Sequence, residues 1–149
     1  MQSNVRIGKL VICSVIVTII SEALYWLVAF ADMRYYTDPV HAEIWSKVMM
    51  PNPGPPPSSF MWYSLLFTFI TAVLFVLVFQ IVLKGVPGSG PAMRGLMYGL
   101  LVFLLAGIPA GLSMYLIINL PTGLIWSWTM QGFVVYLVNG LIVGAINRG

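Results

Sequence analysis

Four long runs of apolar residues, separated by short polar connections, make up most of the chain. They cover Leu10 to Ala31, Phe60 to Leu83, Ala92 to Ile118 and Leu124 to Ile146. Each run is long enough to cross a hydrocarbon core about 30 Å thick, which takes about 20 helical residues. The runs are continuously apolar, whereas the strands of a membrane barrel alternate between apolar and polar positions. Because backbone groups in lipid must be hydrogen-bonded within the segment, the pattern predicts an all-α fold of four transmembrane helices in an antiparallel bundle.

The composition supports a membrane location. Hydrophobic residues make up 60% of the 149 residues and charged residues only 7%, whereas about a quarter of the residues in a soluble domain are charged. The net charge of +3 comes from cations spread along the chain, without the basic cluster that nucleic acid requires. The lone cysteine, Cys13, cannot form an internal disulfide. We therefore expect a single transmembrane domain over residues 1–149, in contact with the lipid bilayer and not with nucleic acid.

Lysines and arginines fall mainly on one side of the predicted bundle. Five of the seven lie before the first helix, between the second and third, or after the fourth: Arg6, Lys9, Lys84, Arg94 and Arg148. Only Arg34 and Lys47 lie on the other side. The positive-inside rule then places both termini in the cytoplasm. The first apolar run is longer than the apolar region of a signal peptide, so we expect an uncleaved anchor in the cell (inner) membrane.

The outer connection, residues 32–59, is the only sizeable segment outside the predicted spans. Asp38 and Pro39 are residues that suit the start of a helix. Apolar residues then recur every four positions: Val40, Ile44 and Val48. This spacing predicts a short interfacial helix, between residues 39 and 50, that lies flat on the membrane surface. The following PNPGPPPSS segment is rich in proline and is expected to be extended.

Glu22 is the only acidic or basic residue well inside a predicted span. A carboxylate in hydrocarbon is costly unless it is protonated, paired or in contact with a water-filled cavity. Glu22 lies about nine residues from the outer end of its helix, or roughly 13 Å deep at about 1.5 Å per residue. The same rise places Thr68 and Gln131 at this depth and Ser113 slightly shallower. The sequence therefore predicts a polar layer of Glu22, Thr68, Ser113 and Gln131.

This polar layer has two interpretations. In the structural one, a protonated Glu22 is hydrogen-bonded to Gln131, and the contact between helices is worth roughly 1 kcal/mol. In the functional one, Glu22 is a proton- or cation-binding site within the membrane. Both interpretations predict that Glu22 faces the bundle interior or an oligomer interface and not lipid.

Pairs of glycines four residues apart mark the third and fourth predicted helices. They are Gly95 and Gly99, Gly107 and Gly111, and Gly140 and Gly144. Such pairs leave a groove into which the backbone of another helix can pack. Because the tight NLPTG turn joins these two helices, we expect them to pack closely and antiparallel. Pro109 removes one helical hydrogen bond and is expected to kink the third helix.

Few other residues could carry chemistry. His41, beside Asp38 and Glu43, is a weak candidate metal ligand, since these residues match no recognised ligand spacing. The sequence contains no glycine-rich phosphate loop, nucleophile elbow or Ser/His/Asp set. We therefore expect neither enzyme activity, nor a cofactor, nor a metal site.

Two stretches of the second half are similar to known membrane proteins. From Arg94 to Ile146 the chain has an RGLMYG opening, a mid-helix proline within GIPAG, and an aromatic last helix. In these features it resembles small four-helix prokaryotic membrane proteins of unknown function, so the resemblance implies a fold but no functional residue. PTGLIWSW, Pro121 to Trp128, resembles a segment of small multidrug resistance transporters. Their glutamate lies earlier in the first helix and their loops are short, so the chain is not assigned to them.

The sequence leaves two functions open. The first is a non-catalytic scaffold, accessory subunit or modulator that binds other membrane proteins. The second is a small oligomeric transporter or channel whose pathway passes Glu22, assembled as a homo-oligomer because four helices enclose little volume. A water-accessible cavity next to Glu22 would favour the second function, and a sealed bundle would favour the first.

Overall fold

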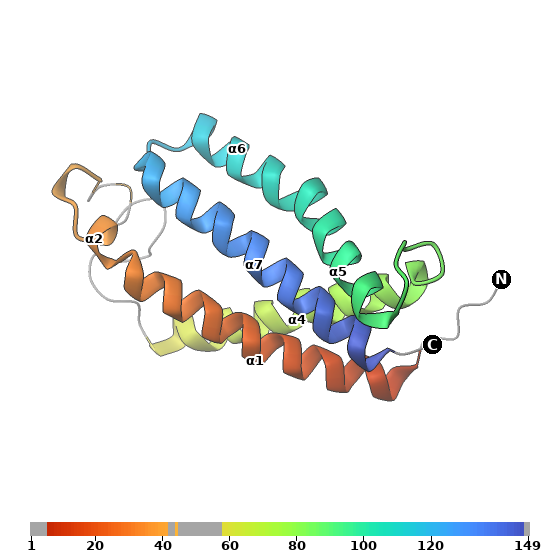
Figure 1. Ribbon diagram of the computed structural model, residues 1–149. Coiled ribbons are helices and arrows are strands. Elements are labelled where there is room, and N and C mark those ends of the chain that lie inside the picture. The colour runs from red at the N-terminus through yellow and green to blue at the C-terminus, as the bar shows by residue number, and fades with distance from the viewer. Residues whose placement is uncertain (1–5, 42–43, 45–57, 148–149) are drawn as a thin grey trace.

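The computed structural model describes residues 6–41, residue 44 and residues 58–147. Within them, four helices are long and apolar enough to cross a membrane (Figure 1): α1 (Ile7–Ala31), α4 (Ser58–Val82), a continuous third helix (Pro91–Ile117) and α7 (Thr122–Ile146). A helix of 25 residues is about 37 Å long at 1.5 Å per residue, which exceeds the hydrocarbon core. The chain is thus a multi-pass membrane protein, and the predicted all-α four-helix fold is confirmed.

Successive long helices run in opposite directions, so α1 begins and α7 ends at the same end of the bundle (Figure 1). We call this the basic end, because it carries Arg6, Lys9, Lys84 and Arg94; the opposite end, with α2 (Met33–Tyr36), is the loop end. Hydrogen bonds join the helices at the basic end. The Arg6 N–H donates to Gln80 Oε1 at 3.1 Å, and Gln80 Nε2 donates to Asn147 Oδ1 at 3.0 Å. The location of the basic end in the cytoplasm stays a prediction.

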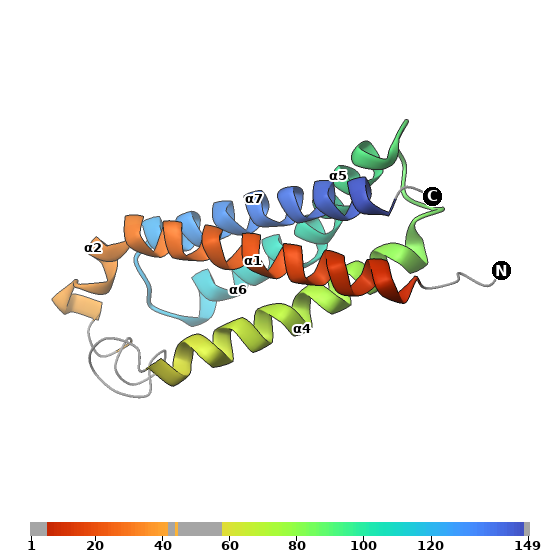
Figure 2. The same cartoon turned by 90° about the horizontal axis from the view of Figure 1, so that it is seen from below.

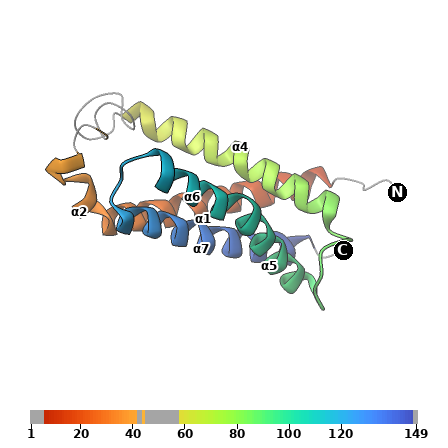
Figure 3. The same cartoon turned by 90° about the horizontal axis from the view of Figure 1, so that it is seen from above.

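Glycines lie at the centre of the most extensive helix contact, between α5 (Pro91–Val102) and α7. A Cβ atom on Gly95 would overlap the carbonyl oxygen of Gly140 and lie 2.8 Å from Gly144 Cα. One on Gly99 would overlap the carbonyl oxygen of Tyr136. The third helix runs alongside α7 in Figures 1 and 3. The predicted close antiparallel packing of these two helices is therefore confirmed.

The glycine pair Gly107 and Gly111 differs from the other two pairs, because each of its glycines lies against a side chain. A Cβ atom on Gly111 would lie 2.5 Å from Thr129 Oγ1, so this position faces a side chain of α7. Gly107 is covered by the ring of Phe103, one turn earlier in the same helix. The groove that the sequence predicts at Gly107 is therefore filled by a side chain of the third helix itself.

The third helix is interrupted near its middle, where Pro109 was expected to bend it. Residues Phe103–Gly107 form a π-helical turn, η3, between α5 and α6 (Ile108–Ile117). Pro109 has no N–H to donate, and its ring would clash with the carbonyl group of Leu105 in a regular α-helix. A wider π turn at that point accommodates the ring. The interruption expected at Pro109 therefore takes the form of this turn.

α1 lies against both α4 and α7 and buries small side chains toward them. Ser14 and Thr18 are buried, and their hydroxyl groups donate to backbone carbonyls one turn earlier, at 2.8 and 2.7 Å. The main apolar core lies in the half of the bundle nearer the basic end and includes Cys13, Val17, Phe75, Val76, Phe79, Tyr98 and Val143. Figure 2 shows α4 inclined to α1 and α7. Ser21 and Glu22 lie farther along α1, toward the loop end.

The predicted interfacial helix between residues 39 and 50 lies mostly outside the described residues. The structure describes Pro39–His41, which form the short 3-10 helix η1, and Ile44. A further short helix, α2, follows α1 directly and has no counterpart among the elements that the sequence predicts.

Candidate functional site

The carboxylate of Glu22 is held between α1 and α4. Its Oε1 atom accepts hydrogen bonds from Thr68 Oγ1 at 2.6 Å and from Ser64 Oγ at 3.1 Å. Ser64 and Thr68 are one helical turn apart on α4, so both hydroxyl groups reach the same oxygen. Glu22 is half-buried. Its carboxyl group therefore lies against two hydrogen-bond donors and does not face lipid alone.

The structure brings together only part of the predicted polar layer. Thr68 contacts Glu22, but Gln131 Nε2 donates to the carbonyl oxygen of Leu24 at 3.4 Å, and Ser113 is exposed on α6. The predicted hydrogen bond between Glu22 and Gln131 is therefore wrong. Helical rise fixes the depth of a residue along the helix axis and says nothing of its direction around that axis. Glu22 points toward α4, whereas Gln131 reaches α1 from α7.

A second polar contact joins α1 to α7 beside Glu22. Asn139 Nδ2 donates to Ser21 Oγ at 2.8 Å, and both residues are buried. Asn139 is only 5% exposed, yet its Oδ1 atom has no hydrogen-bond partner among the described residues. A buried carbonyl without a donor costs about 1–3 kcal/mol. The sequence shows Asn139 as one more amide in a span, and nothing in its spacing indicates this unpaired oxygen.

A partly enclosed hollow of about 160 Å³ lies between α1, α4 and α7, next to these two contacts. Its polar lining comes from Ser21, Thr68, Thr71 and Asn139. Its aromatic lining comes from Tyr25, Phe67, Phe75 and Tyr136. Glu22 is one hydrogen bond away, because Thr68 both lines the hollow and donates to the carboxylate. The hollow therefore offers a space of ligand size beside the intramembrane acid.

A second carboxylate, which is buried, lies at the loop end of the bundle. Asp32 follows α1, is 5% exposed, and accepts a hydrogen bond from Ser127 Oγ of α7 at 2.7 Å. Nearby, burial raises the pKa of the Tyr36 hydroxyl, while a hydrogen bond with Trp128 opposes that shift. In the sequence, Asp32 directly follows the first apolar run. No local signal links it to Ser127, which is 95 positions away in the chain.

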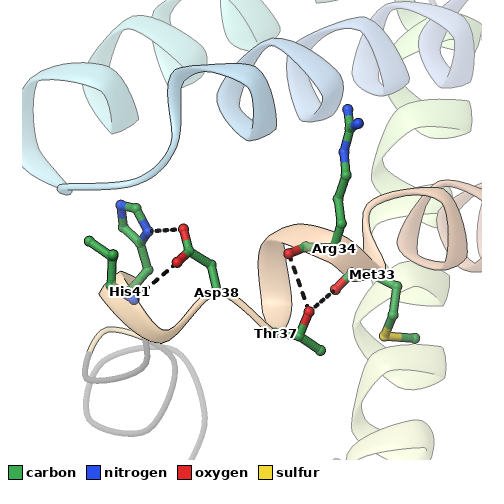
Figure 4. A network of polar contacts seen from close by, with 6 residues as sticks. Met33, Arg34, Thr37, Asp38 and His41 are labelled. Carbon is green, nitrogen blue, oxygen red and sulfur yellow. Dashed lines mark hydrogen bonds and ion pairs between the residues drawn. The ribbon is translucent and has the colours of Figure 1, made fainter.

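His41, the weak candidate metal ligand, is paired with Asp38 (Figure 4). His41 Nδ1 lies 2.8 Å from Asp38 Oδ2, and the Val40 N–H donates to Asp38 Oδ1 at 3.0 Å. The hydrogen bond with His41, followed by that from Val40, holds the pKa of Asp38 below its ordinary value. Among the described residues, which do not include Glu43, no three His, Cys, Asp or Glu side chains form a group that could hold a metal ion. The pair orders the short turn that follows α2.

Comparison of the chain with protein-family models, with curated proteins and with solved structures finds no match. The four long apolar helices are consistent with a small four-helix membrane protein, as the resemblance over residues 94–146 implies. Because a fold of this kind does not determine an activity, function is inferred from the site.

Proposed function

We propose that the protein binds a cation or a small polar solute at Glu22, as a subunit of a small transporter or channel in the cell membrane. The observation that carries this proposal is the hollow beside the Glu22 carboxylate, which Thr68 connects to it. An ionisable residue inside a span is expensive to keep and typically marks a pathway or a ligand site. A purely structural contact between α1 and α4 would not require an adjoining space whose lining includes polar side chains.

The size of the bundle supports an oligomer. A hollow of about 160 Å³ has room for one small ligand, since an engineered cavity of about 150 Å³ holds a benzene molecule. A pathway across the whole membrane needs more helix surface than this chain encloses. A symmetric homo-oligomer is the simplest way to supply that surface.

A non-catalytic scaffold, accessory subunit or modulator of other membrane proteins is the second candidate. It is favoured by α6, in which no residue is buried within the single chain. Leu116 and Ile117 are 81% and 80% exposed. A helix that contributes so little to its own bundle presents most of its surface to lipid or to the helix of a partner. Neither candidate involves a reaction, and we propose no enzyme activity.

Ion flux into proteoliposomes tests the first candidate. Purified protein is reconstituted with a dye for protons, sodium or potassium inside the vesicles, and a gradient of the corresponding ion is imposed in turn. We expect the wild type to dissipate at least one gradient faster than empty vesicles, and Glu22→Gln to lose this effect with an unchanged circular dichroism spectrum. Asp38→Asn is the matched control, because it exchanges a carboxylate for an amide outside the spans and should keep the wild-type rate.

Two results would contradict the proposal. One is a wild type that carries no flux under any of these gradients. The other is a Glu22→Gln variant that conducts as well as the wild type, which would make Glu22 a contact between helices and favour the scaffold.

A further inference from the structure

The basic end of the bundle carries positive side chains and, among the described residues, no acidic one. All four acidic residues of the chain lie between residues 22 and 43 of the sequence, within α1 or in the connection that follows it. The cations of the basic end lie at the start of α1 and from the end of α4 to the first turn of α5. They therefore form a surface of one charge, which attracts anions from a distance.

Three of these cations are exposed and have charged groups available to a partner. Arg94 Nε donates to the carbonyl oxygen of Gly88 at 3.3 Å, and the two Nη groups of Arg94 have no hydrogen-bond partner among the described residues. Arg6 uses only its backbone N–H, which donates to Gln80 Oε1. The Lys84 ammonium group has no partner within the same part of the chain. Guanidinium and ammonium groups are the usual protein ligands of phosphate.

The three cations come from segments that meet at the basic end. The hydrogen bond from Arg6 places the start of α1 beside Gln80, in the last turn of α4. Lys84 lies in the turn that directly follows α4, four residues after Gln80. The connection then leads to the first turn of α5, which contains Arg94 and lies at the same end of the bundle (Figure 1). An anionic layer at this end therefore meets cations from both α1 and the connection.

Exposed apolar side chains continue this surface into the spans. Ile7 and Val11 follow Arg6 along α1, and Ile81 precedes Lys84 at the end of α4; all three are exposed. A soluble phosphate would contact the cations and leave these side chains uncovered. A phospholipid carries a phosphate group at one end and acyl chains at the other, so it matches both parts of the surface.

The loop end lacks this combination. Arg34 is the one lysine or arginine that the structure describes there. It donates to Tyr35 Oη at 3.2 Å and lies over the Tyr35 ring, 4.8 Å from its centroid. Asp32 and Asp38 lie at the same end. The two ends of the bundle therefore differ in charge, and Arg34 provides a control that carries the same charge elsewhere.

We propose that the basic end is a docking surface for anionic phospholipids. Their phosphate groups pair with Arg6, Lys84 and Arg94, and their acyl chains lie against the exposed apolar residues of α1 and α4. A zwitterionic lipid is bound less well, because its own ammonium group is repelled by the same three cations. The surface is separate from Glu22, so this proposal does not depend on the proposed function.

Native mass spectrometry of the full chain, released from non-ionic detergent micelles, tests the class of lipid. The probes are phosphatidylglycerol, phosphatidylcholine with the same acyl chains, and glycerol phosphate. We expect phosphatidylglycerol to be retained at least about tenfold more tightly than phosphatidylcholine, and less tightly as added salt screens the cations. Equal retention of the two lipids would overturn the recognition of charge. Displacement of phosphatidylglycerol by an equal concentration of glycerol phosphate would mean that the cations bind a soluble anion, and the lipid surface would be refuted.

Variants with one positive charge fewer test the location. Lys84→Gln should weaken the retention of phosphatidylglycerol by about fivefold, the effect of one cation near an anionic membrane surface. Arg34→Gln is the matched control and should leave it unchanged. Both side chains are exposed, so both variants should keep the circular dichroism spectrum of the wild type. Equal losses in the two variants would show that net charge alone matters, and the surface at the basic end would be refuted.

The combined variant Arg6→Gln, Lys84→Gln and Arg94→Gln removes the surface as a whole. It should retain phosphatidylglycerol no better than phosphatidylcholine, while the backbone N–H of residue 6 can still donate to Gln80. Retention of phosphatidylglycerol at the level of the wild type would contradict the proposal.

Discussion

Replacing Gly95 by alanine tests the contact between α5 and α7 with the smallest side chain that has a Cβ atom. That atom would overlap the carbonyl oxygen of Gly140, and it would lie 2.9 Å from the carbonyl carbon of Gly140 and 2.8 Å from Gly144 Cα. All of these are backbone atoms, which cannot rotate away as a side chain can. The two helices must therefore move apart. Gly132 of α7 is the matched control, because a Cβ atom there meets nothing within 4 Å.

The expected loss of stability follows from comparing the two variants. Each exchange of glycine for alanine gains up to about 1 kcal/mol in helix propensity, so the difference between Gly95→Ala and Gly132→Ala isolates the cost of packing. Adding carbon atoms to a well-packed interior typically costs about 1–3 kcal/mol. Because the clash involves only backbone, we expect the upper part of that range, with Gly95→Ala about 2–3 kcal/mol less stable than Gly132→Ala.

Unfolding in mixed micelles measures this difference. Protein in dodecyl maltoside is titrated with sodium dodecyl sulfate, and the loss of native structure is followed by tryptophan fluorescence and circular dichroism. The midpoint for Gly95→Ala should lie at a clearly lower fraction of dodecyl sulfate than that for Gly132→Ala. If the free energies of unfolding agree within about 0.5 kcal/mol, the range of ordinary surface substitutions, the packing described for Gly95 is refuted.

Three further predictions concern Glu22, the Asp38 pair and the orientation. Thr68→Val should lower the free energy of unfolding in the same titration by about 1 kcal/mol. Ser64→Ala should lower it by less, because the hydrogen bond from Ser64 to Glu22 is longer. An unchanged midpoint for Thr68→Val would contradict the hydrogen bond between Thr68 and Glu22. By NMR titration the pKa of Asp38 should lie below its ordinary value and rise toward it in His41→Asn. The stabilisation from the contact between Asp38 and His41 is then present above the ordinary pKa of Asp38 and is lost as the pH falls through its lowered pKa. An unshifted pKa of Asp38 in the wild type would contradict this contact. Reporter fusions at residue 50 and at the C-terminus should report opposite sides, with the C-terminus cytoplasmic; reports from the same side would refute the topology.

The spans and the glycine contact could be predicted from the sequence because each depends on a single local property. A run of about 20 apolar residues has few alternatives to a membrane helix, and the ends of the four observed helices lie within one turn of the predicted ones. Glycines four residues apart fall on one face of a helix. Their spacing therefore indicates which faces of α5 and α7 can approach closely, although Gly107 shows that a neighbouring ring can fill such a face.

The partners of the polar residues could not be predicted, because they depend on how each helix is rotated about its axis. Glu22 and Gln131 lie at similar depths by helical rise, yet Glu22 bonds to α4 and Gln131 to the backbone of α1. The unpaired oxygen of Asn139 also depends on this rotation, which places Nδ2 on Ser21 and leaves Oδ1 without a donor. Spacing within one helix does not contain this information.

The claim that ligands reach Glu22 is tested most directly by infrared difference spectroscopy in reconstituted bilayers. Spectra are recorded as potassium or sodium is added and removed, for the wild type and for Glu22→Gln. We expect the carboxyl band of Glu22 to change when a cation binds, and this difference band to be missing from the Glu22→Gln spectrum. Difference spectra that are the same for both proteins with every cation would contradict the account and leave Glu22 as a contact between α1 and α4.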